Sequence, residues 1–414
     1  MKKHFSLIFI TLLAGFSIFA IAGADPMINV RNYPLEYCFK QIQWYLISLI
    51  AIYCISKLSN QDFYRFSLPI YLFFLTAVWL LAIQHQITRF GGPTIIPFSQ
   101  NINGATAWYY FPGVGSIQPS EFLKMAYLLA LSEIIDNHHR LQAKQKKLWN
   151  LKLIGKIMLL TMPAALGILL QNDSGVMMIL LTGTIAMILV SGISKKWICA
   201  GFTVLLFLAM LFYRYLSNEI SGFDPETSSY RLGRIIGWLD PETYYSSYGF
   251  QLYQALLSMG TAGFFGHGFQ SIVMAFPEPQ TDFIFAVLIT DAGFLAGLLL
   301  ISVMAALDIY LYRLSKKTTD PRSRYLLSGL IAILGFQQFW NIGMVLGLVP
   351  ITGITLPFIS YGGSSLVSYM LMMGIVFNIE SEIAGKVRAN PQRSLTDQKQ
   401  DEQKTNKNCE VPAR

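Results

Sequence analysis

The sequence predicts an all-α integral membrane protein with about ten transmembrane helices. Of its 414 residues, 53% are hydrophobic and only 13% are charged, so few charges are available to cover a water-exposed surface. Apolar runs of about 18 residues or more, the length that a helix needs to cross a bilayer, recur along the chain. The expected spans lie near residues 4–23, 42–58, 66–84, 119–136, 151–170, 174–192, 197–215, 282–312, 325–346 and 357–380. The fourth is interrupted by Glu121 and Lys124, and the eighth is long enough to contain a bend.

Basic residues concentrate in alternate connections between these spans. They are Lys2 and Lys3; Lys57 and Arg65; Arg140, Lys144, Lys146, Lys147 and Lys152; Lys195 and Lys196; Arg313, Lys316, Lys317, Arg322 and Arg324; and the tail from Lys386. Because cytoplasmic loops carry the excess of lysine and arginine, this pattern places both termini in the cytoplasm. The net charge of +8 then reflects topology, with anionic lipid headgroups rather than nucleic acid as its neighbours.

The two ends of the chain suggest its domain organisation. We expect one polytopic membrane domain over 1–385 and a cytoplasmic, disordered tail over 386–414, because that stretch is strongly polar. The small residues of AGADP, at 22–26, also permit an alternative in which a signal peptide is cleaved and the new N-terminus lies outside. The four cysteines are widely spaced and predict neither a disulfide framework nor a metal site.

Two segments are expected outside the membrane. The first, 85–118, carries NGATAWYYFPGVGSIQPSE. The second, 216–281, is a large extracellular loop between spans seven and eight, and its middle predicts an amphipathic helix lying against the bilayer or the protein.

Four ionisable residues fall within the outer third of their expected spans: Glu121, Lys124, Asp173 and Asp282. Ionisable groups are costly inside a bilayer, and they mark either a function or a paired structural contact. Their shared depth predicts one cavity that opens outward.

Asp282 follows FPEPQT and precedes an apolar run that continues almost unbroken to Tyr312. One interpretation is a helix N-cap, in which Thr281 or Asp282 accepts hydrogen bonds from unpaired backbone N–H groups. The other is a general base whose pKa is raised by apolar neighbours. Asp291 lies half a turn away on an ideal helix, so we do not expect it to share this site.

The remaining polar residues each have two interpretations. Glu121 and Lys124, three apart, either neutralise each other or leave Lys124 to bind phosphate. Asp173 either caps the next helix or lines the cavity. Arg231 and Arg234 are both expected outside, where they can bind a diphosphate or anionic headgroups.

The last span contains a second unusual stretch, LPFISYGGSSLVSYM at 356–370. Pro357, Gly362 and Gly363 break the helical pattern beside several hydroxyl groups. Non-helical backbone at membrane depth occurs only where protein or a water-filled cavity covers it. The stretch is therefore either a hinge or packing notch, or a turn that contacts substrate.

Five stretches together resemble the SEDS family (shape, elongation, division and sporulation), which includes RodA, FtsW and SpoVE. They are NGATAWYYFPGVGSIQPSEFLK (103–124), LQNDSGVMMILLTGTIAMILVSG (170–192), RIIGWLDPETYYSSYGFQLYQALLSMGTAGFFGHG (234–268), FPEPQTDFIFAVL (276–288) and NIGMVLGLVPITGITLPFISYGGSSL (341–366). They follow the family's order over some two-thirds of the chain.

The resemblance implies a peptidoglycan glycosyltransferase that polymerises lipid II on the outer face of a bacterial plasma membrane. It implies that Asp282 is catalytic and that Lys124 belongs to the cavity. It also implies a class B penicillin-binding protein as partner and leaves room for Mg²⁺ or Mn²⁺, although no dedicated metal site is predicted. Adding the polar residues discussed above, the expected substrate-binding residues are Lys124, Glu121, Gln118, Asp173, Arg231, Arg234, Ser360, Gly362, Gly363 and Ser364.

Three departures from the family pattern predict a divergent member. Ala107 replaces an arginine, Thr290 replaces the first glutamate of a Glu-Glu-x-Gly stretch, and 172–175 keeps only the Asp and Gly of a Pro-Asp-Leu-Gly stretch. Two other functions therefore stay open. One is a flippase for a lipid-linked sugar, which would need polar groups across the midplane, such as Asp291 and Asp308. The other is a catalytically weak scaffold for a penicillin-binding protein.

Overall fold

A computed structural model of the protein describes residues 5–28, 34–102, 104–113, 115–141, 148–221 and 230–389. The helices are α1 (Phe5–Ile28), α2 (Glu36–Ile55), α3 (Asn60–Arg89), α4 (Pro119–Leu141), α5 (Trp149–Leu170), α6 (Ser174–Val190), α7 (Lys195–Ser221), α8 (Tyr230–Leu239), α9 (Phe250–Thr261), α10 (Ile284–Lys317), α11 (Pro321–Val345) and α12 (Gly363–Ala389). This mainly helical architecture confirms the predicted fold class.

The long helices follow the predicted spans in order. Within the described residues, eight of them are long and apolar enough to cross a membrane: α1, α2, α3, α5, α7, α10, α11 and α12. Helix α6 is apolar but has only 17 residues, and α4 carries several charged side chains. The protein is thus a multi-pass membrane protein, while a total of ten crossings stays a prediction.

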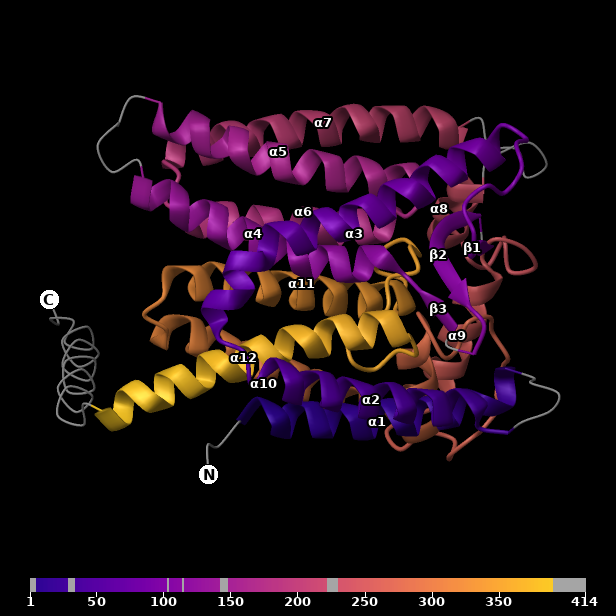
Figure 1. Ribbon diagram of the computed structural model, residues 1–414. Helices are drawn as coiled ribbons and strands as arrows, with labels where there is room; N and C mark the ends of the chain where they lie inside the picture. The colour runs from indigo at the N-terminus through magenta and orange to yellow at the C-terminus, as the bar shows by residue number, and fades with distance from the viewer. Residues whose placement is uncertain are drawn as a thin grey trace, which may run out of the picture.

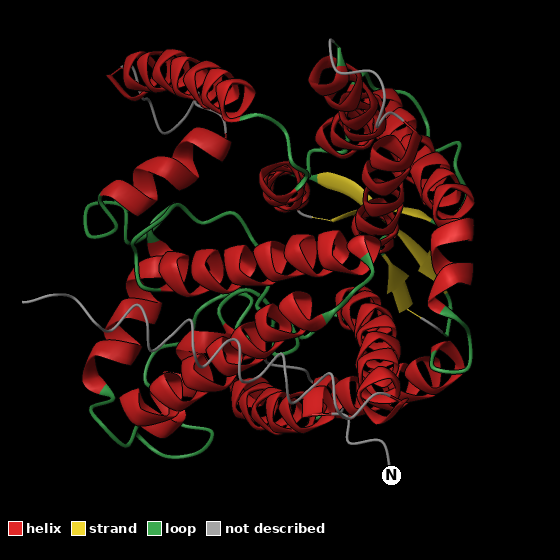
Figure 2. Cartoon of the chain, turned by 90° about the vertical axis from the view of Figure 1, so that its left-hand side faces the viewer, coloured by secondary structure: helices red, strands yellow, loops and turns green. Residues whose placement is uncertain are grey.

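The helices lie side by side, and the two ends of the bundle differ (Figure 1). Helix α1 begins and α12 ends at one end, whereas the strands and the short helices α8 and α9 gather at the other. In Figure 2 the strands lie behind the helices, at the end farther from the viewer. Helices α8 and α9 occupy the region where an amphipathic helix was expected. Trp238 of α8 fixes this region to the bundle by donating from Nε1 to the Gly347 carbonyl at 2.8 Å.

A small antiparallel sheet forms in the first outer segment, for which no secondary structure is predicted from the sequence. Its strands are β1 (Ser99–Ile102), β2 (Ala105–Phe111) and β3 (Gly115–Ile117), in the order β1-β2-β3. Aromatic and β-branched residues dominate β2, as strands favour. The Thr106 N–H donates to the Gln171 carbonyl at 3.3 Å, which holds the sheet against the turn between α5 and α6.

Helix α10 contains the bend expected of the eighth span. Gly293 has non-helical backbone angles, φ 80° and ψ 179°, a conformation open to glycine alone. The loop over 263–268 fills the break: the His267 N–H donates to the Thr290 carbonyl at 2.8 Å, and the Phe294 N–H donates to the Gly263 carbonyl at 3.0 Å. Asp291 accepts from the Gln270 N–H at 3.1 Å. The break is therefore a fixed junction between helix and loop.

Several helix boundaries differ from the expected ones. Helix α12 begins at Gly363, so Pro357 and Gly362 lie in the turn before it and not within a span. Helix α12 also continues to Ala389, past the expected domain end at 385, and the rest of the predicted tail lies outside the described residues. The AGADP stretch lies within α1, whose Ser17 donates to the Ile359 carbonyl at 2.7 Å.

Candidate active site

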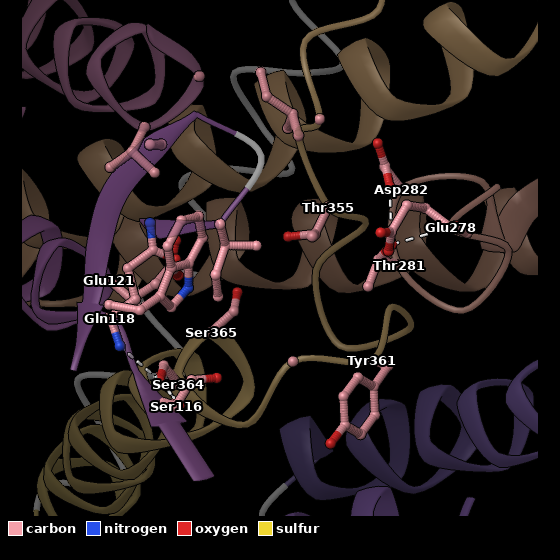
Figure 3. A pocket seen from close by; sticks show the side chains of 18 of the residues that line it. Ser116, Gln118, Glu121, Glu278, Thr281, Asp282, Thr355, Tyr361, Ser364 and Ser365 are labelled. Carbon is pink, nitrogen blue, oxygen red and sulfur yellow. Dashed lines mark hydrogen bonds between the residues drawn. The ribbon is translucent and has the colours of Figure 1, made fainter. Parts of the chain in front are cut away.

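A cavity of about 1460 Å³ is lined in part by residues of the sheet, and the sheet lies at one end of the bundle (Figure 1). Its walls come from segments far apart in the sequence: α2, the sheet, the starts of α4 and α6, α8 and α9, and the turns before α10 and α12. Figure 3 shows two groups of polar side chains facing each other across it. One group contains Glu278, Thr281 and Asp282, and the other contains Gln118, Glu121 and Ser364.

Asp282 lies in the turn before α10, with 8% of its surface exposed. The N-cap interpretation is wrong, because the α10 N-cap is Phe283 and no side chain caps this helix. The Asp282 carboxyl instead lines the cavity, where its Oδ1 lies 2.8 Å from Oγ1 of Thr281. Burial raises the pKa of Asp282 from its ordinary value of 3.8 to about 6. A carboxylate with such a pKa can accept a proton near neutral pH.

The backbone around Asp282 is held from two sides. Asn341 of α11 donates through Nδ2 to the Asp282 carbonyl at 2.8 Å and to the Ile354 carbonyl at 2.7 Å. Ser360 donates through Oγ to the Thr281 carbonyl at 2.6 Å. Ser360 is itself buried, so it supports the turn and is not among the residues that line the cavity.

On the opposite wall, Gln118 connects two predicted site residues. Its Nε2 donates to Oδ2 of Asp173 at 2.8 Å, and its backbone N–H donates to Oγ of Ser364 at 3.0 Å. Asp173 also accepts from the Val176 N–H at 3.1 Å, so it caps α6 and lines the cavity at the same time. Burial raises the pKa of Asp173 to about 6. Gly362 and Gly363 line the cavity beside Ser364.

Glu121 and Lys124 form an ion pair, with Lys124 Nζ 2.8 Å from Glu121 Oε2. Glu121 lines the cavity, whereas the Lys124 side chain is 0% exposed and lies behind it. Lys124 Nζ also sits 4.7 Å from the centre of the Tyr369 ring. The internal-pair interpretation thus describes the geometry, and a direct contact between Lys124 and substrate would require this pair to open.

The two arginines stand differently. Arg234 of α8 lines the cavity, and its positive charge partly offsets the rise in the pKa of Asp282. Arg231 lies one turn earlier on α8, but its side chain is outside the described residues. Within the part of the chain that the structure describes, no three His, Cys, Asp or Glu side chains group to hold a metal ion, and Mg²⁺ or Mn²⁺ stays a prediction.

Comparison with known proteins identifies the relatives of this chain. A family model described as a cell cycle protein, representing FtsW, RodA and SpoVE, matches residues 3–384. The chain belongs to the FtsW/RodA/SpoVE family. It is 35% identical to stage V sporulation protein E of Bacillus subtilis over 285 residues, 67% of this chain and 72% of that protein. The SEDS resemblance is thus confirmed.

Other FtsW/RodA/SpoVE proteins match over more of the chain. The probable peptidoglycan glycosyltransferase FtsW of Bacillus subtilis is 30% identical over 393 residues, 91% of this chain and 90% of that protein. A solved structure, described as structural coordination of polymerization and crosslinking by a peptidoglycan synthase complex, aligns with a TM-score of 0.72 at 24% identity. It covers 92% of this chain and 98% of the matched chain. At 24% identity, this solved structure supports the fold alone.

Two departures from the FtsW/RodA/SpoVE pattern lie away from the cavity surface. Thr290 is fully buried, and its Oγ1 donates to the Ala286 carbonyl at 2.8 Å. Ala107 is also fully buried, in β2. Neither residue is among those that line the cavity.

Several residues that line the cavity are not among the predicted site residues. They include Trp44, Trp108, Tyr248, Gly353, Thr355, Tyr361 and Glu278. Glu278 was visible in the FPEPQTD stretch, and its spacing from Asp282 could have marked it as a second carboxylate. Trp44 and Gly353 carried no comparable signal, because only the packing of α2 and of the loop before α12 brings them to the cavity.

Proposed function

We propose that this protein is a peptidoglycan glycosyltransferase that polymerises lipid II into glycan strands on the outer face of a bacterial plasma membrane. The observation that carries the proposal is a buried carboxyl, Asp282, on the wall of a large cavity at one end of the bundle. FtsW proteins of the same family are named probable peptidoglycan glycosyltransferases.

The chemistry suits the residues present. The 4-hydroxyl of one lipid-linked sugar attacks the anomeric carbon of another, and undecaprenyl diphosphate leaves. Asp282 takes the proton from the attacking hydroxyl. Arg234, which lines the same cavity, stabilises the diphosphate that departs. A single in-line displacement inverts the anomeric centre and needs no covalent enzyme intermediate.

The cavity also has an apolar edge that suits a lipid-linked substrate. Leu46 and Ile47 of α2 line the cavity and are 57% and 48% exposed on the outside of the bundle. Polyprenyl chains can therefore stay in the bilayer while their sugars enter the polar interior. We place this end outside the cell and both termini in the cytoplasm, because the basic connections, such as that between α10 and α11, lie at the opposite end.

The partner that we propose is a class B penicillin-binding protein, a transpeptidase that crosslinks the new strands. The structural neighbour described as a peptidoglycan synthase complex that coordinates polymerization and crosslinking supports this pairing. The bilayer is the second partner that we propose.

The competing functions have weaker support. A flippase would need a polar path across the midplane, but Asp291 is engaged by the backbone N–H of Gln270 at 3.1 Å. The scaffold function was suggested by Ala107 and Thr290, which depart from the family pattern. Both side chains are buried, and neither residue lines the cavity.

One experiment separates the three functions. Purified protein, alone and with its transpeptidase, is incubated with lipid II in liposomes, and both polymer and translocated substrate are measured. Polymer that disappears in Asp282→Ala supports the enzyme. Translocation without polymer supports the flippase, and transpeptidase binding without either product supports the scaffold.

A further inference from the structure

A single hydroxyl group lies between two carboxyl groups in the turn before α10. Oγ1 of Thr281 is 2.8 Å from Oδ1 of Asp282 and 2.9 Å from Oε2 of Glu278. Both distances are those of hydrogen bonds between oxygen atoms. Figure 3 shows the three side chains in one row on the cavity wall.

The number of hydrogen atoms limits how this row can be charged. A hydroxyl carries one hydrogen, and an ionised carboxylate can only accept. If Asp282 and Glu278 were both ionised, one of the two short contacts would have no hydrogen in it. The contacts are both satisfied when one carboxyl group is protonated and donates to Thr281. With both carboxyl groups ionised, Thr281 can therefore donate to only one of them at a time, and a proton that reaches Asp282 supplies the hydrogen for the other contact.

The two ends of the row differ in their access to water. Asp282 is 8% exposed, whereas Glu278 is exposed at the cavity mouth. Glu278 has a left-handed backbone, with φ 53°, which is rare for a residue other than glycine and marks a position that its surroundings enforce. The row thus leads from a buried carboxyl to water.

The neighbouring turn holds the row in place. The Gln280 Nε2 donates to Oε2 of Glu278 at 3.3 Å. The Tyr361 N–H donates to the Gln280 carbonyl at 2.8 Å, and Ser360 Oγ donates to the Thr281 carbonyl at 2.6 Å. Because backbone and side chains are both fixed, the three oxygens keep their order without help from substrate.

We propose that Thr281 and Glu278 form a proton relay that carries the proton of the acceptor sugar from Asp282 to the outer solution. The proposal rests on the function proposed above. Thr281 and Glu278 act through Asp282 and are positioning residues for proton transfer.

Proton transfer through the relay accompanies the bond changes at the two sugars. The acceptor O–H bond breaks as its oxygen bonds to the anomeric carbon, and the bond from that carbon to the diphosphate breaks with its electron pair leaving on the diphosphate. The proton goes to Asp282, and a half-turn of that carboxyl group brings it to Thr281. Thr281 accepts this proton while passing its own to Glu278, which releases it to water. Asp282 is then ionised again for the next sugar.

The charged groups that face Asp282 determine how each variant should respond to pH. They are Glu278 from its own turn, whose negative charge raises the pKa of Asp282, and Arg234 from α8, whose positive charge lowers it. The hydrogen bond from Thr281 also lowers this pKa. The loop over 351–355 contributes no ionisable side chain, and α11 contributes the amide of Asn341.

The test measures polymerisation of lipid II against pH with the full-length protein and its transpeptidase. In Glu278→Gln and in Thr281→Val we expect kcat at the high-pH plateau to fall about tenfold, since a proton outlet is lost while Asp282 remains. The acidic limb should move to lower pH in Glu278→Gln and to higher pH in Thr281→Val, each by about half a unit to one unit. Thr281→Ser keeps the hydroxyl, so its plateau kcat and the pH of its acidic limb should match those of the wild type.

A matched control is Glu242→Gln, an exposed glutamate in the loop between α8 and α9 that is not among the residues lining the cavity; it should behave as wild type. Wild-type plateau kcat in both Glu278→Gln and Thr281→Val, with Asp282→Asn inactive, overturns the relay alone. Activity retained in Asp282→Asn overturns the proposed function itself. If Thr281→Val does not fold, Glu278→Gln and Thr281→Ser decide, because a wild-type plateau in Glu278→Gln is enough to reject the relay.

Discussion

Replacing the Asp282 carboxyl by an amide should remove activity and stabilise the fold at the same time. Asn has nearly the same shape and can still accept a hydrogen bond from Thr281, but it cannot take a proton. General-base catalysis contributes roughly 10²–10⁴ in rate, so Asp282→Asn should lower kcat for lipid II polymerisation by at least about 100-fold. At 1.36 kcal/mol per tenfold, this corresponds to about 2.7 kcal/mol or more of transition-state stabilisation.

The stability change follows from the raised pKa. In the folded protein burial raises the pKa of Asp282 from 3.8 to about 6, so the folded state prefers the protonated form. Stability is then greatest below the unfolded pKa and is lost as pH rises from about 4 to about 6. At neutral pH the ionised carboxyl destabilises the fold by on the order of 3 kcal/mol, using 1.36 kcal/mol per pKa unit. Asp282→Asn removes this term.

The assay pairs thermal unfolding in detergent with polymer formation between pH 5 and pH 8. Wild-type kcat should fall tenfold per unit below about pH 6, because protonated Asp282 cannot act as a base. Asp240→Asn is the control, since Asp240 is exposed in the loop after α8. If Asp282→Asn keeps activity within twofold of wild type, the assignment of Asp282 as the general base is refuted. If Asp282→Asn unfolds at a lower temperature than wild type at pH 7.5, the predicted gain in stability is refuted.

Three further substitutions test how the site is held. Lys124→Met leaves the buried Glu121 charge unpaired and should destabilise the fold by about 3–5 kcal/mol in thermal unfolding. Adding Glu121→Gln should recover this stability. Equal stability of the single and double variants would contradict the prediction. Gly363→Ala places a Cβ 2.3 Å from Cε2 of Trp44. We therefore expect the free energy of unfolding to fall by about 1–3 kcal/mol and lipid II binding to weaken in a titration. Wild-type stability and binding would show that α2 and α12 can move apart freely. Asn341→Ala removes two hydrogen bonds to the turns around Asp282 and should lower kcat more than it raises KM, whereas a change in KM alone would assign Asn341 to substrate binding.

The sequence was sufficient for the features that depend on hydropathy and on residue type. The apolar runs predicted each long helix in order, and the length of the eighth run predicted the bend found at Gly293. The depth of Glu121, Asp173 and Asp282 predicted that they line one cavity. These succeed because the bilayer imposes one length scale on every span and because charge is tolerated there only in a protein-lined space.

Features that depend on contacts between distant segments could not be predicted in this way. The sheet of 99–117 exists because its strands pair with one another and because Thr106 bonds to the backbone before α6, a partner that local composition does not reveal. Lys124 has the same sequence signal whether it faces the cavity or an internal partner. Its burial behind Glu121 is decided by the neighbouring Tyr369 of α12.

The position of Asp282 shows why a turn, and not a helix, holds the carboxyl. On a helix, its backbone would be satisfied within the helix and the side chain would follow the helix surface. In the turn, the Asp282 carbonyl needs an outside donor, and Asn341 supplies it while also holding Ile354. Thr281 and Gln280 are held in the same way by Ser360 and Tyr361. Each missing helical hydrogen bond therefore becomes a contact with the loops around α11 and α12, so the burial that raises the pKa of Asp282 is enforced by three separate parts of the chain.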